Sequence, residues 1–339
     1  MLLSESLLIL YREYIANNYI LYLVGGAVRD SLLSLIPKDY DFVTDANIEQ
    51  SVSILQKLGY SYNVDEYHGV IKIKSLNVEI TRFRKDLERG FQFNVSIEDD
   101  ANRRDLTYNA IYYDISNQRY LDFHNGVGDL NNKLIRMIGN PEQRIREDKT
   151  RILRILKYAA RYDHRIDFDM TNDLSGISEE IIANEIVDGN NQYFKLLDDF
   201  NLYPSVFPKL IVNFCEIETR YIEIRLACLL QNNVDIEEKL KLLKYGRKLS
   251  ETVAFLIELI NFDVNKLNYY LVKRNKIDLE ILKEWIAVMK LGEYQHKFLT
   301  FKSPITKIMV DELVKLGYNG DKLSEKLSEI NKNDFLNVD

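Results

Sequence analysis

Two aspartates spaced two residues apart follow a glycine pair near the start of the chain. The segment Leu23–Asp30 reads LVGGAVRD, and Asp39 and Asp41 come nine residues later. Residues two apart on a strand leave the same face, so the two carboxylates would lie side by side. Adjacent carboxylates repel unless a cation lies between them, and Mg²⁺ binds hard oxygen ligands together with substrate phosphates. The spacing predicts a Mg²⁺ site at Asp39 and Asp41, suited to phosphoryl or nucleotidyl transfer.

The glycine pair itself could bind the phosphates of such a substrate. Gly25 and Gly26 carry no side chain, so backbone N–H groups could approach a phosphate closely, and Arg29 could donate to the same group. Alone, a Gly-Gly pair is weak evidence and an Asp-x-Asp pair is more often a surface turn. Their joint occurrence in this order favours the phosphate site over the turn.

A second polar segment, RRDLTYNA at Arg103–Ala110, leads into an expected strand. Its two arginines, an acid and an amide could contact a triphosphate and ribose hydroxyls. These residues are Arg103, Arg104, Asp105 and Asn109. The alternative is a helix N-terminus with its flanking charges, and the segment alone does not decide between the two.

A third polar segment, RIREDKTRILR at Arg144–Arg154, is expected to be helical. Residues three apart are neighbours on a helix, so we expect Asp148 and Arg151 to share one face. A carboxylate that accepts and a guanidinium that donates can together recognise the hydrogen-bonding edge of a base. The alternative is an ordinary surface ion pair.

The charge of the chain is distributed unevenly. The 339 residues carry a net charge of −7, which argues weakly against a nucleic-acid partner. However, residues 101–165 hold 13 Lys or Arg against 8 Asp or Glu, so a phosphate-rich ligand could bind there, although a solvated helix face would look the same.

The sequence contains no stretch expected to span a membrane and begins with a poor export signal. We therefore expect a cytoplasmic protein, in which Cys215 and Cys228 are buried free thiols.

The pattern of apolar residues changes near Gly139-Asn140-Pro141, from mixed strands and helices to helices alone. Before this point the pattern predicts an α+β sheet of about five strands, at 20–24, 40–44, 70–73, 78–81 and 110–115, with helices at 3–14, 28–35 and 48–58. After it, beyond the helical segment that contains Asp148, the pattern predicts helices at about 178–188, 191–201, 219–231, 235–245, 249–261, 264–274, 278–290 and 307–330.

The three polar segments, in this order and spacing, resemble the bacterial and eukaryotic class of tRNA nucleotidyltransferases, the CCA-adding enzymes of the DNA-polymerase-beta-like superfamily. The family patterns GGxVRD followed by DxD, RRDxTxNA, and ExxRIxEDxxRxLR are matched over residues 20–165. The resemblance implies a small mixed-sheet nucleotidyltransferase head at 1–135, followed by an all-α neck at 136–195, body at 196–268 and tail at 269–339 that binds tRNA.

The resemblance also assigns roles to individual residues. Asp39 and Asp41 would be the catalytic residues that hold Mg²⁺. The nucleotide would be bound by Gly25, Gly26, Arg29, Arg104, Asp105, Asn109, Glu147, Asp148, Arg151, Arg154 and Lys157. Among these, Asp148 and Arg151 would accept CTP and ATP and reject UTP and GTP, with Glu147 supporting Arg151. Glu79, on the neighbouring strand, would be a supporting carboxylate and is a weaker candidate than the other site residues. Lys157 occupies a position where the family tends to have arginine.

One departure from the family concerns specificity. Between Phe83-Arg84-Lys85-Asp86 and Phe93, where the family has a flexible loop, only Leu87–Gln92 is present. In the family this loop helps the site change from C addition to A addition, and enzymes without it add two cytidines and leave the adenosine to a separate A-adding enzyme. We therefore expect CTP addition to the 3′ end of the tRNA acceptor arm and leave open the use of ATP. Two alternatives remain, a poly(A) polymerase and a non-catalytic RNA-binding relative.

Overall fold

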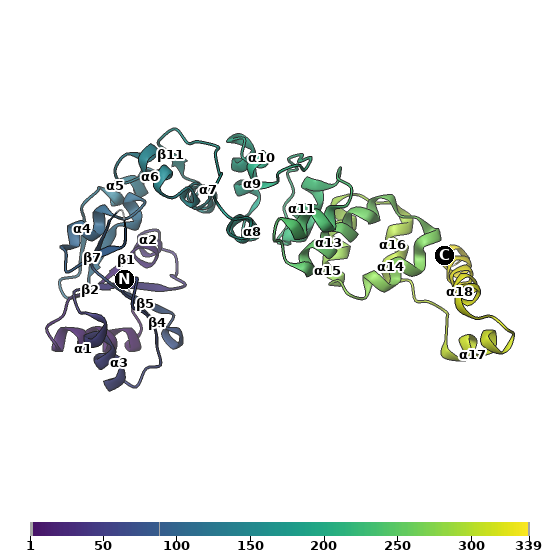
Figure 1. Cartoon of the computed structure of the whole chain (residues 1–339), viewed down its shortest axis with the longest axis horizontal. Helices are drawn as coiled ribbons and strands as arrows, with labels where there is room; N and C mark the ends of the chain where they lie inside the picture. The colour runs from purple at the N-terminus through teal and green to yellow at the C-terminus, as the bar shows by residue number, and fades with distance from the viewer. Residues whose placement is uncertain (1–2, 88, 338–339) are drawn as a thin grey trace. The chain divides into compact units, whose positions relative to one another are not determined.

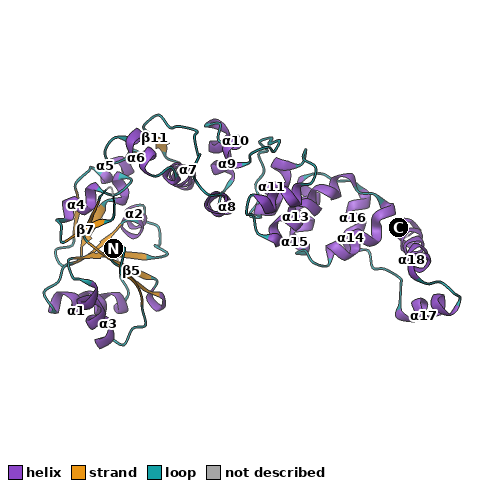
Figure 2. Cartoon of the chain, viewed as in Figure 1, coloured by secondary structure: helices purple, strands orange, loops and turns teal. Residues whose placement is uncertain are grey.

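A computed structural model of the protein describes residues 3–87 and 89–337 (Figure 1). The chain divides into two compact units, residues 1–171 and residues 172–339. The first unit contains every strand of the described chain, and the second consists of helices and loops (Figure 2). This confirms the predicted fold class, a mixed-sheet head followed by a helical remainder. The finer division into neck, body and tail stays a prediction.

A seven-stranded mixed sheet forms the centre of the first unit, in the order β3-β4-β5-β2-β1-β8-β9. Its strands are β1 Leu21–Val24, β2 Tyr40–Thr44, β3 Asn63–Asp65, β4 Val70–Ile73, β5 Val78–Arg82, β8 Ile111–Asp114 and β9 Arg119–Asp122. The five predicted strands occupy the middle of this order. The two additional strands, β3 and β9, form its edges, where exposed polar residues conceal the alternation that marks a strand.

Two short strand pairs lie outside the main sheet. The antiparallel pair is β6 Arg84–Asp86 with β7 Phe91–Phe93, and the parallel pair is β10 Leu134–Ile135 with β11 Arg165–Ile166. The first pair contains the shortened loop identified in the sequence, where the Leu87 N–H donates to the Gly90 carbonyl oxygen at 3.1 Å. Glu88, within this loop, lies outside the described residues.

Helices of the first unit cover the sheet and extend beyond it. They are α1 Glu5–Ala16, α2 Gly26–Leu32, α3 Ile48–Lys57, α4 Ile97–Asn102, α5 Gly126–Asn131, α6 Pro141–Glu147 and α7 Thr150–Tyr162, with 3-10 turns η1 Lys74–Leu76 and η2 Thr107–Asn109. Helices α1 and α3 lie side by side (Figure 1). Asn47 begins α3 with a capping box, in which its side chain accepts from the Gln50 N–H and the Gln50 side chain accepts in return.

The hydrophobic core of the first unit fixes the strands that carry the polar segments. Val24 and Val43, next to the glycine turn and the aspartate pair, pack in one buried cluster with Ala110, the last residue of the RRD segment Arg103–Ala110, and Tyr112 of β8. Ile138, just before α6, belongs to the same cluster. Because these apolar residues are immediate chain neighbours of the polar candidates, their packing determines where the polar side chains lie.

The second unit is a succession of short helices. They are α8 Glu179–Val187, α9 Asn191–Asp199, α10 Tyr203–Val206, α11 Ile222–Leu230, α12 Ile236–Leu242, α13 Arg247–Glu258, η3 Leu259–Asn261, η4 Val264–Lys266, α14 Leu267–Arg274, α15 Leu279–Val288, α16 Glu293–Thr300, α17 Lys307–Lys315 and α18 Gly320–Asn337. Trp285 is fully buried at the centre of α15, and its indole N–H donates to the Leu256 carbonyl oxygen of α13 at 2.6 Å. In the described part of the chain, no helix is long and apolar enough to cross a membrane.

Two predicted helices are each divided in the structure. The segment around Asp148 is not one helix, because α6 ends at Glu147 and Asp148 has an extended backbone, with φ −151° and ψ 98°. The Asp148 carboxylate accepts from the Thr150 N–H at 2.9 Å and so begins a new helix, α7. The predicted helix at 307–330 is divided at Gly317, whose φ of +94° is incompatible with a right-handed helix.

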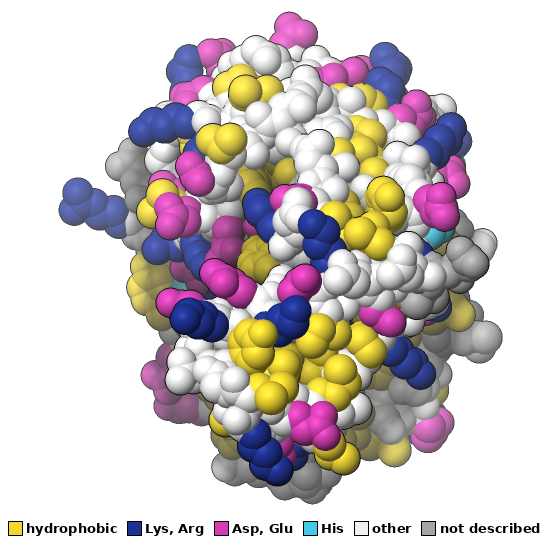
Figure 3. All heavy atoms as spheres, turned by 90° about the vertical axis from the view of Figure 1, so that its right-hand side faces the viewer, with side chains coloured by type: hydrophobic (Ala, Val, Ile, Leu, Met, Phe, Trp, Pro, Cys, Tyr) yellow, Lys and Arg dark blue, Asp and Glu magenta, His cyan; other side chains and the backbone are white. Residues whose placement is uncertain are grey.

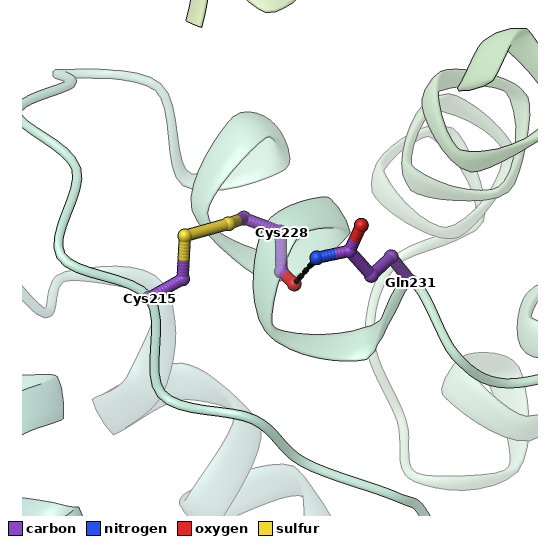
Figure 4. Close-up of a disulfide and its surroundings, with 3 residues drawn as sticks. All are labelled: Cys215, Cys228 and Gln231. Carbon is purple, nitrogen blue, oxygen red and sulfur yellow. Dashed lines mark hydrogen bonds between the residues drawn. A yellow bond between two sulfur atoms is a disulfide. The ribbon is translucent and has the colours of Figure 1, made fainter. Parts of the chain in front are cut away.

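The two cysteines form a disulfide, so the prediction of two free thiols is wrong (Figure 4). Cys228 lies within α11, whereas Cys215 lies in an irregular segment that passes beside this helix. Their Cα atoms are 6.3 Å apart, within the range a disulfide can span. The Gln231 side chain donates to the Cys228 carbonyl oxygen at 3.1 Å and so contributes to ending the helix. The sequence could not show this approach, because it arises from tertiary packing.

The second unit leaves several large hydrophobic side chains exposed near its C-terminal end. They are Tyr294, Ile308, Val314, Leu316 and Leu336. The space-filling view shows hydrophobic side chains gathered on the face that it presents (Figure 3). Helix α17 contains none of the buried residues of this unit, so its apolar side chains contribute little to the core.

Candidate active site

The glycine turn connects strand β1 to helix α2 at the centre of the candidate site. Gly25 has φ +71° and ψ −130°, a conformation that residues with a Cβ rarely adopt. A Cβ at Gly25 would lie 3.6 Å from Oδ2 of Asp41 and 3.9 Å from Nη1 of Arg104. A Cβ at Gly26 would lie 4.0 Å from Oδ1 of Asp39. The structure therefore brings the two glycines, both aspartates and Arg104 together, as the sequence suggested.

Three carboxylates lie close to one another on strands β2 and β5. Asp39 precedes β2 and is exposed, Asp41 lies within β2, and Glu79 is the register partner of Asp41 on β5. Burial, followed by the charges of Glu79 and Asp39, raises the pKa of Asp41 to about 6, although Arg104 and Lys72 oppose the shift. The negative charge at Asp41 is therefore only partly compensated by the protein.

This excess of negative charge fits a divalent cation. The pKa of Asp41 is raised first by burial and then by the neighbouring carboxylates, and a bound cation would relieve both effects. Lys72 compensates one of the acids, because its Nζ lies 2.7 Å from Oε2 of Glu79. Within residues 3–87 and 89–337, no group of three or more His, Cys, Asp or Glu side chains is arranged as a metal site. The fit therefore depends on Asp39 and Asp41, with water and substrate oxygens as the remaining ligands.

Arg104 lies beside Gly25 and Asp41, and a network of hydrogen bonds holds its guanidinium there. Its Nε and Nη2 donate to Oδ2 of Asp100, at 3.2 and 3.1 Å, and its Nε also lies 3.1 Å from the hydroxyl of Tyr112. Asp100 is fully buried and also accepts from Arg103 and from the Tyr112 hydroxyl. Burial raises the pKa of Asp100, but the two arginines outweigh this effect and the net shift is downward.

Arg29 lies beside the glycine turn, since a Cβ at Gly26 would be 3.6 Å from its Nη2. Its guanidinium is buried, with Nε and Nη2 donating to Oδ1 of Asp30 and Nη1 donating to Oδ1 of Asn109 at 2.6 Å. It also lies 5.0 and 4.8 Å from the ring centroids of Tyr158 and Tyr162 on α7. These contacts place Arg29 as a support between the glycine turn and α7. Its predicted contact with triphosphate stays a prediction.

A line of hydrogen bonds continues from Arg29 to the basic face of α7. The Asn109 amide accepts from Arg29 through Oδ1 and donates to Oδ1 of Asp105 at 3.3 Å. The other carboxylate oxygen of Asp105 accepts from Nη2 of Arg154. Burial raises the pKa of Asp105, but Arg154 and these hydrogen bonds lower it by more, so the carboxylate is held ionised. Lys157, one turn further along α7, is half-buried.

The expected base-reading residues lie around the break between α6 and α7. Nη1 of Arg151 donates to the backbone carbonyl oxygen of Arg144 and lies 3.4 Å from Oε2 of Glu147. One carboxylate oxygen of Asp148, Oδ1, accepts hydrogen bonds from the N–H and the hydroxyl of Thr150. Since Asp148 lies between two helices, the predicted sharing of one helix face with Arg151 is wrong. The two residues nevertheless remain adjacent, because the Arg151 N–H donates to the Asp148 carbonyl oxygen at 3.2 Å.

Several residues that organise the site were missed by sequence reasoning. They are Asp30, Asp100, Tyr112, Arg144, Tyr158 and Tyr162. Asp100 could have been found from the two arginines that follow it in the sequence, because a buried carboxylate needs charged partners. The tyrosines gave no usable signal, because the chain contains 22 of them and their helical spacing fits an ordinary core.

Comparison with known proteins identifies the first unit. Residues 21–136 match the family described as the poly A polymerase head domain. This part of the chain is therefore similar to the head of a poly A polymerase. The chain is thereby related to the tRNA nucleotidyltransferases of the DNA-polymerase-beta-like superfamily, which confirms the resemblance recognised in its motifs.

Individual relatives extend the match beyond the head. Poly(A) polymerase I of Salmonella typhi is 31% identical over 257 residues, which cover 68% of this chain and 55% of the relative. The human mitochondrial CCA tRNA nucleotidyltransferase 1 is 33% identical over 229 residues, covering 60% of this chain and 52% of the relative. The chain therefore spans about half the length of these curated relatives.

A solved structure shares the fold of nearly the whole of this chain. The Bacillus stearothermophilus CCA-adding enzyme in complex with CTP superposes with a TM-score of 0.66 at 22% identity, covering 96% of this chain and 81% of that one. The mixed-sheet head and the helical remainder thus share the fold of that CCA-adding enzyme.

Proposed function

We propose that this protein is a tRNA nucleotidyltransferase that adds cytidines to the 3′ end of tRNA without a nucleic-acid template. The observation that carries the proposal is the position of Asp39, Asp41 and Arg104 directly beside the turn formed by Gly25 and Gly26. The site thus offers carboxylates for a cation and a guanidinium for phosphates next to a turn with no side chain in the way. A relative named as a tRNA nucleotidyltransferase and a CTP-bound structure of the same fold support the choice of substrates.

In the proposed reaction, the terminal tRNA hydroxyl attacks the α-phosphate of CTP and pyrophosphate leaves. Asp39 and Asp41 would hold Mg²⁺, which supplies Lewis-acid stabilisation of the phosphate oxygens when bound. Arg104 would orient the triphosphate, and Asp105 would orient the ribose. Asp148 and Arg151 would select the base by its hydrogen-bonding edge. The basic face of α7, with Arg154 and Lys157, would contribute to nucleotide binding, and the proposed location of the protein is the cytoplasm.

We further propose that the enzyme stops after two cytidines. The segment that replaces the family's flexible loop is a short antiparallel hairpin, β6–β7, paired from Arg84–Phe93 to Asp86–Phe91. A short paired hairpin has fewer conformations than an open loop and so offers less freedom to rearrange the site for ATP. A separate A-adding enzyme would then complete the tail.

A tRNA transcript that lacks its 3′ CCA tests the proposal directly. The protein is incubated with Mg²⁺ and CTP, ATP or both, and the products are resolved at single-nucleotide steps. Addition of two residues from CTP alone, with none from ATP even onto a tRNA that ends in CC, supports the CC-adding assignment. Addition of three residues from the mixture contradicts the CC-only part, and no addition contradicts the enzymatic proposal itself.

The second candidate is a poly(A) polymerase. The observation that favours it is the identity of 31% with poly(A) polymerase I over 257 residues, together with the description of the matched head family. This candidate predicts long tails from ATP alone, on RNA that need not be tRNA. The same gel distinguishes it, because a ladder of many adenosines replaces a discrete one- to three-nucleotide extension.

A further inference from the structure

We propose that Arg144 is a positioning residue that couples the phosphate-binding arginine segment to the base-selecting residues, and so sets nucleotide selectivity. This inference rests on the proposed function and deepens it, because neither the motif roles nor the catalytic carboxylates involve Arg144. The residue lies in α6, and its side chain connects two segments that are about 40 residues apart in the chain.

One end of the Arg144 side chain holds the backbone of the RRD segment. Its Nη2 donates to the carbonyl oxygens of both Arg103 and Arg104, the latter at 3.1 Å. Two carbonyl oxygens on one guanidinium nitrogen fix the path of the backbone from which the Arg104 side chain extends toward Gly25. The position of Arg144 therefore bears on where the triphosphate would lie.

The other end of the residue holds the base-selecting segment. Its Nη1 donates to Oε2 of Glu147 at 2.8 Å, and its own carbonyl oxygen accepts from Nη1 of Arg151. The same Glu147 oxygen lies 3.4 Å from Arg151. Glu147 and Arg144 together thus orient the Arg151 guanidinium, which would read the edge of the base.

Burial separates Arg144 from the other arginines of its helix. The Arg144 side chain is 15% exposed, whereas the Arg146 side chain is 75% exposed and pairs only with Glu142 among the ion pairs of the described chain. Gly139, just before α6, faces the Arg144 stem, since a Cβ there would lie 3.9 Å from its Cγ and Cδ. Burying a guanidinium costs free energy unless its donors are used. Both terminal nitrogens of Arg144 donate, whereas its buried Nε has no hydrogen-bond partner in the described chain.

The planar shape of guanidinium is needed for this arrangement. Two terminal nitrogens at a fixed angle can bind the RRD carbonyl oxygens and the Glu147 carboxylate at once, whereas a lysine ammonium is a single compact charge that can satisfy only one of the two. A displacement of about 1 Å at a recognition group can change a rate by about 100-fold. Loss of the bridge should therefore alter the choice of nucleotide more than the chemistry of transfer.

The test compares Arg144→Lys and Arg144→Ala with the matched control Arg146→Ala, which removes an arginine two residues away on the same helix. Steady-state incorporation of CMP and of UMP onto a tRNA that lacks its CCA end gives kcat and KM for each nucleotide. We expect both Arg144 variants to lower the CTP-over-UTP preference in kcat/KM by about 10- to 100-fold. In Arg144→Lys the change should lie mainly in KM, and Arg146→Ala should keep the wild-type preference.

A second measurement covers the case in which Arg144→Ala folds poorly. Equilibrium binding of CTP and UTP to Arg144→Lys, with a thermal melt to establish folding, gives the same ratio without turnover. An unchanged CTP-over-UTP ratio in folded Arg144→Lys overturns the inference while leaving the proposed function intact. A wild-type protein that extends no RNA overturns the proposed function first, so the two failures are distinguishable.

Discussion

At the scale of single residues, the candidate site depends on charges that the protein leaves only partly compensated. Asp41 shows this best, because burial and two neighbouring carboxylates raise its pKa to about 6 while Arg104 compensates it only in part. A bound cation would remove this repulsion and at the same time organise the phosphates. The carboxylates near the glycine turn are therefore expected to contribute to catalysis more than to stability.

The first prediction concerns the two aspartates. Replacing Asp41 by Asn should reduce nucleotide addition by about 1,000-fold or more, because the metal's stabilisation of developing charge amounts to several kcal/mol. Binding of tRNA should change little, because we expect the helical remainder to provide most of the tRNA-binding surface. Primer-extension rates and a gel-shift titration measure the two effects. The control is Asp65→Asn on edge strand β3, an exposed acid whose partner is His68. Activity near the wild-type level in Asp41→Asn would refute the assignment.

The second prediction concerns the glycine turn. Gly25→Ala should lower the free energy of unfolding by about 1–3 kcal/mol, because alanine is strained at φ +71° and ψ −130°. Steric overlap is not the cause, since the added Cβ would have its nearest neighbour at 3.6 Å. Gly26→Ala is the matched control, as Gly26 lies in α2 without a positive φ and should lose little stability. Urea denaturation of both variants measures the difference, and equal stabilities would argue against backbone strain.

At the scale of elements, the sequence predicted what local periodicity determines and failed where a tertiary contact decides. Strand β2 was predicted with its observed bounds, because Tyr40–Thr44 alternates and is followed by a strong helix cap. The break at Asp148 is local and not tertiary, and it was missed because helical spacing continues across it. Asp148 nevertheless has an extended backbone, and its carboxylate accepts from the Thr150 N–H. The grouping of the glycine turn, the aspartates and Arg104 was expected, but the burial of Arg29 among tyrosines depends on the packing of α7.

The third prediction concerns Asp100 of α4, which anchors the arginine pair. Its pKa is lowered in the folded protein, so it stabilises the fold above its unfolded pKa of about 4 and this contribution is lost as the pH falls through the folded value. Asp100→Asn should therefore be less stable than the wild type at pH 7, and the difference should shrink as the pH is lowered below about 4. Denaturation at several pH values measures it. A difference that is independent of pH would show that packing, not charge, holds the arginines.

The fourth prediction concerns the disulfide beside α11. A link between residues 13 apart closes a loop for which chain entropy predicts a stabilisation of about 3 kcal/mol. Cys215→Ser should lower the stability of the second unit and leave CTP binding by the first unit unchanged, since Cys215 lies in the second unit. Because disulfides are rare in a reducing cytosol, thiol counting on freshly isolated protein also bears on location. Two free thiols in the isolated protein, with no stability change in Cys215→Ser, would contradict the disulfide.

At the scale of the whole molecule, the division at residue 171 separates the chemistry from most of the helical mass. All the candidate catalytic and nucleotide-binding residues, from Gly25 to Lys157, lie in the first unit, which also has its own sheet and buried core. The second unit has a separate core around Trp285. Each unit therefore has the internal packing that independent folding requires.

The fifth prediction follows from this division. Residues 1–171 expressed alone should fold cooperatively and bind CTP with Mg²⁺ with an affinity within about threefold of the whole chain, because no candidate nucleotide contact is removed. Affinity for tRNA should fall by about tenfold or more, since the helical unit provides the remaining surface for shape recognition of the acceptor arm. Calorimetry with CTP and filter binding with tRNA measure the two affinities. If the fragment binds tRNA as tightly as the whole chain, RNA recognition resides in the first unit, and the basic face of α7 then becomes its principal RNA contact.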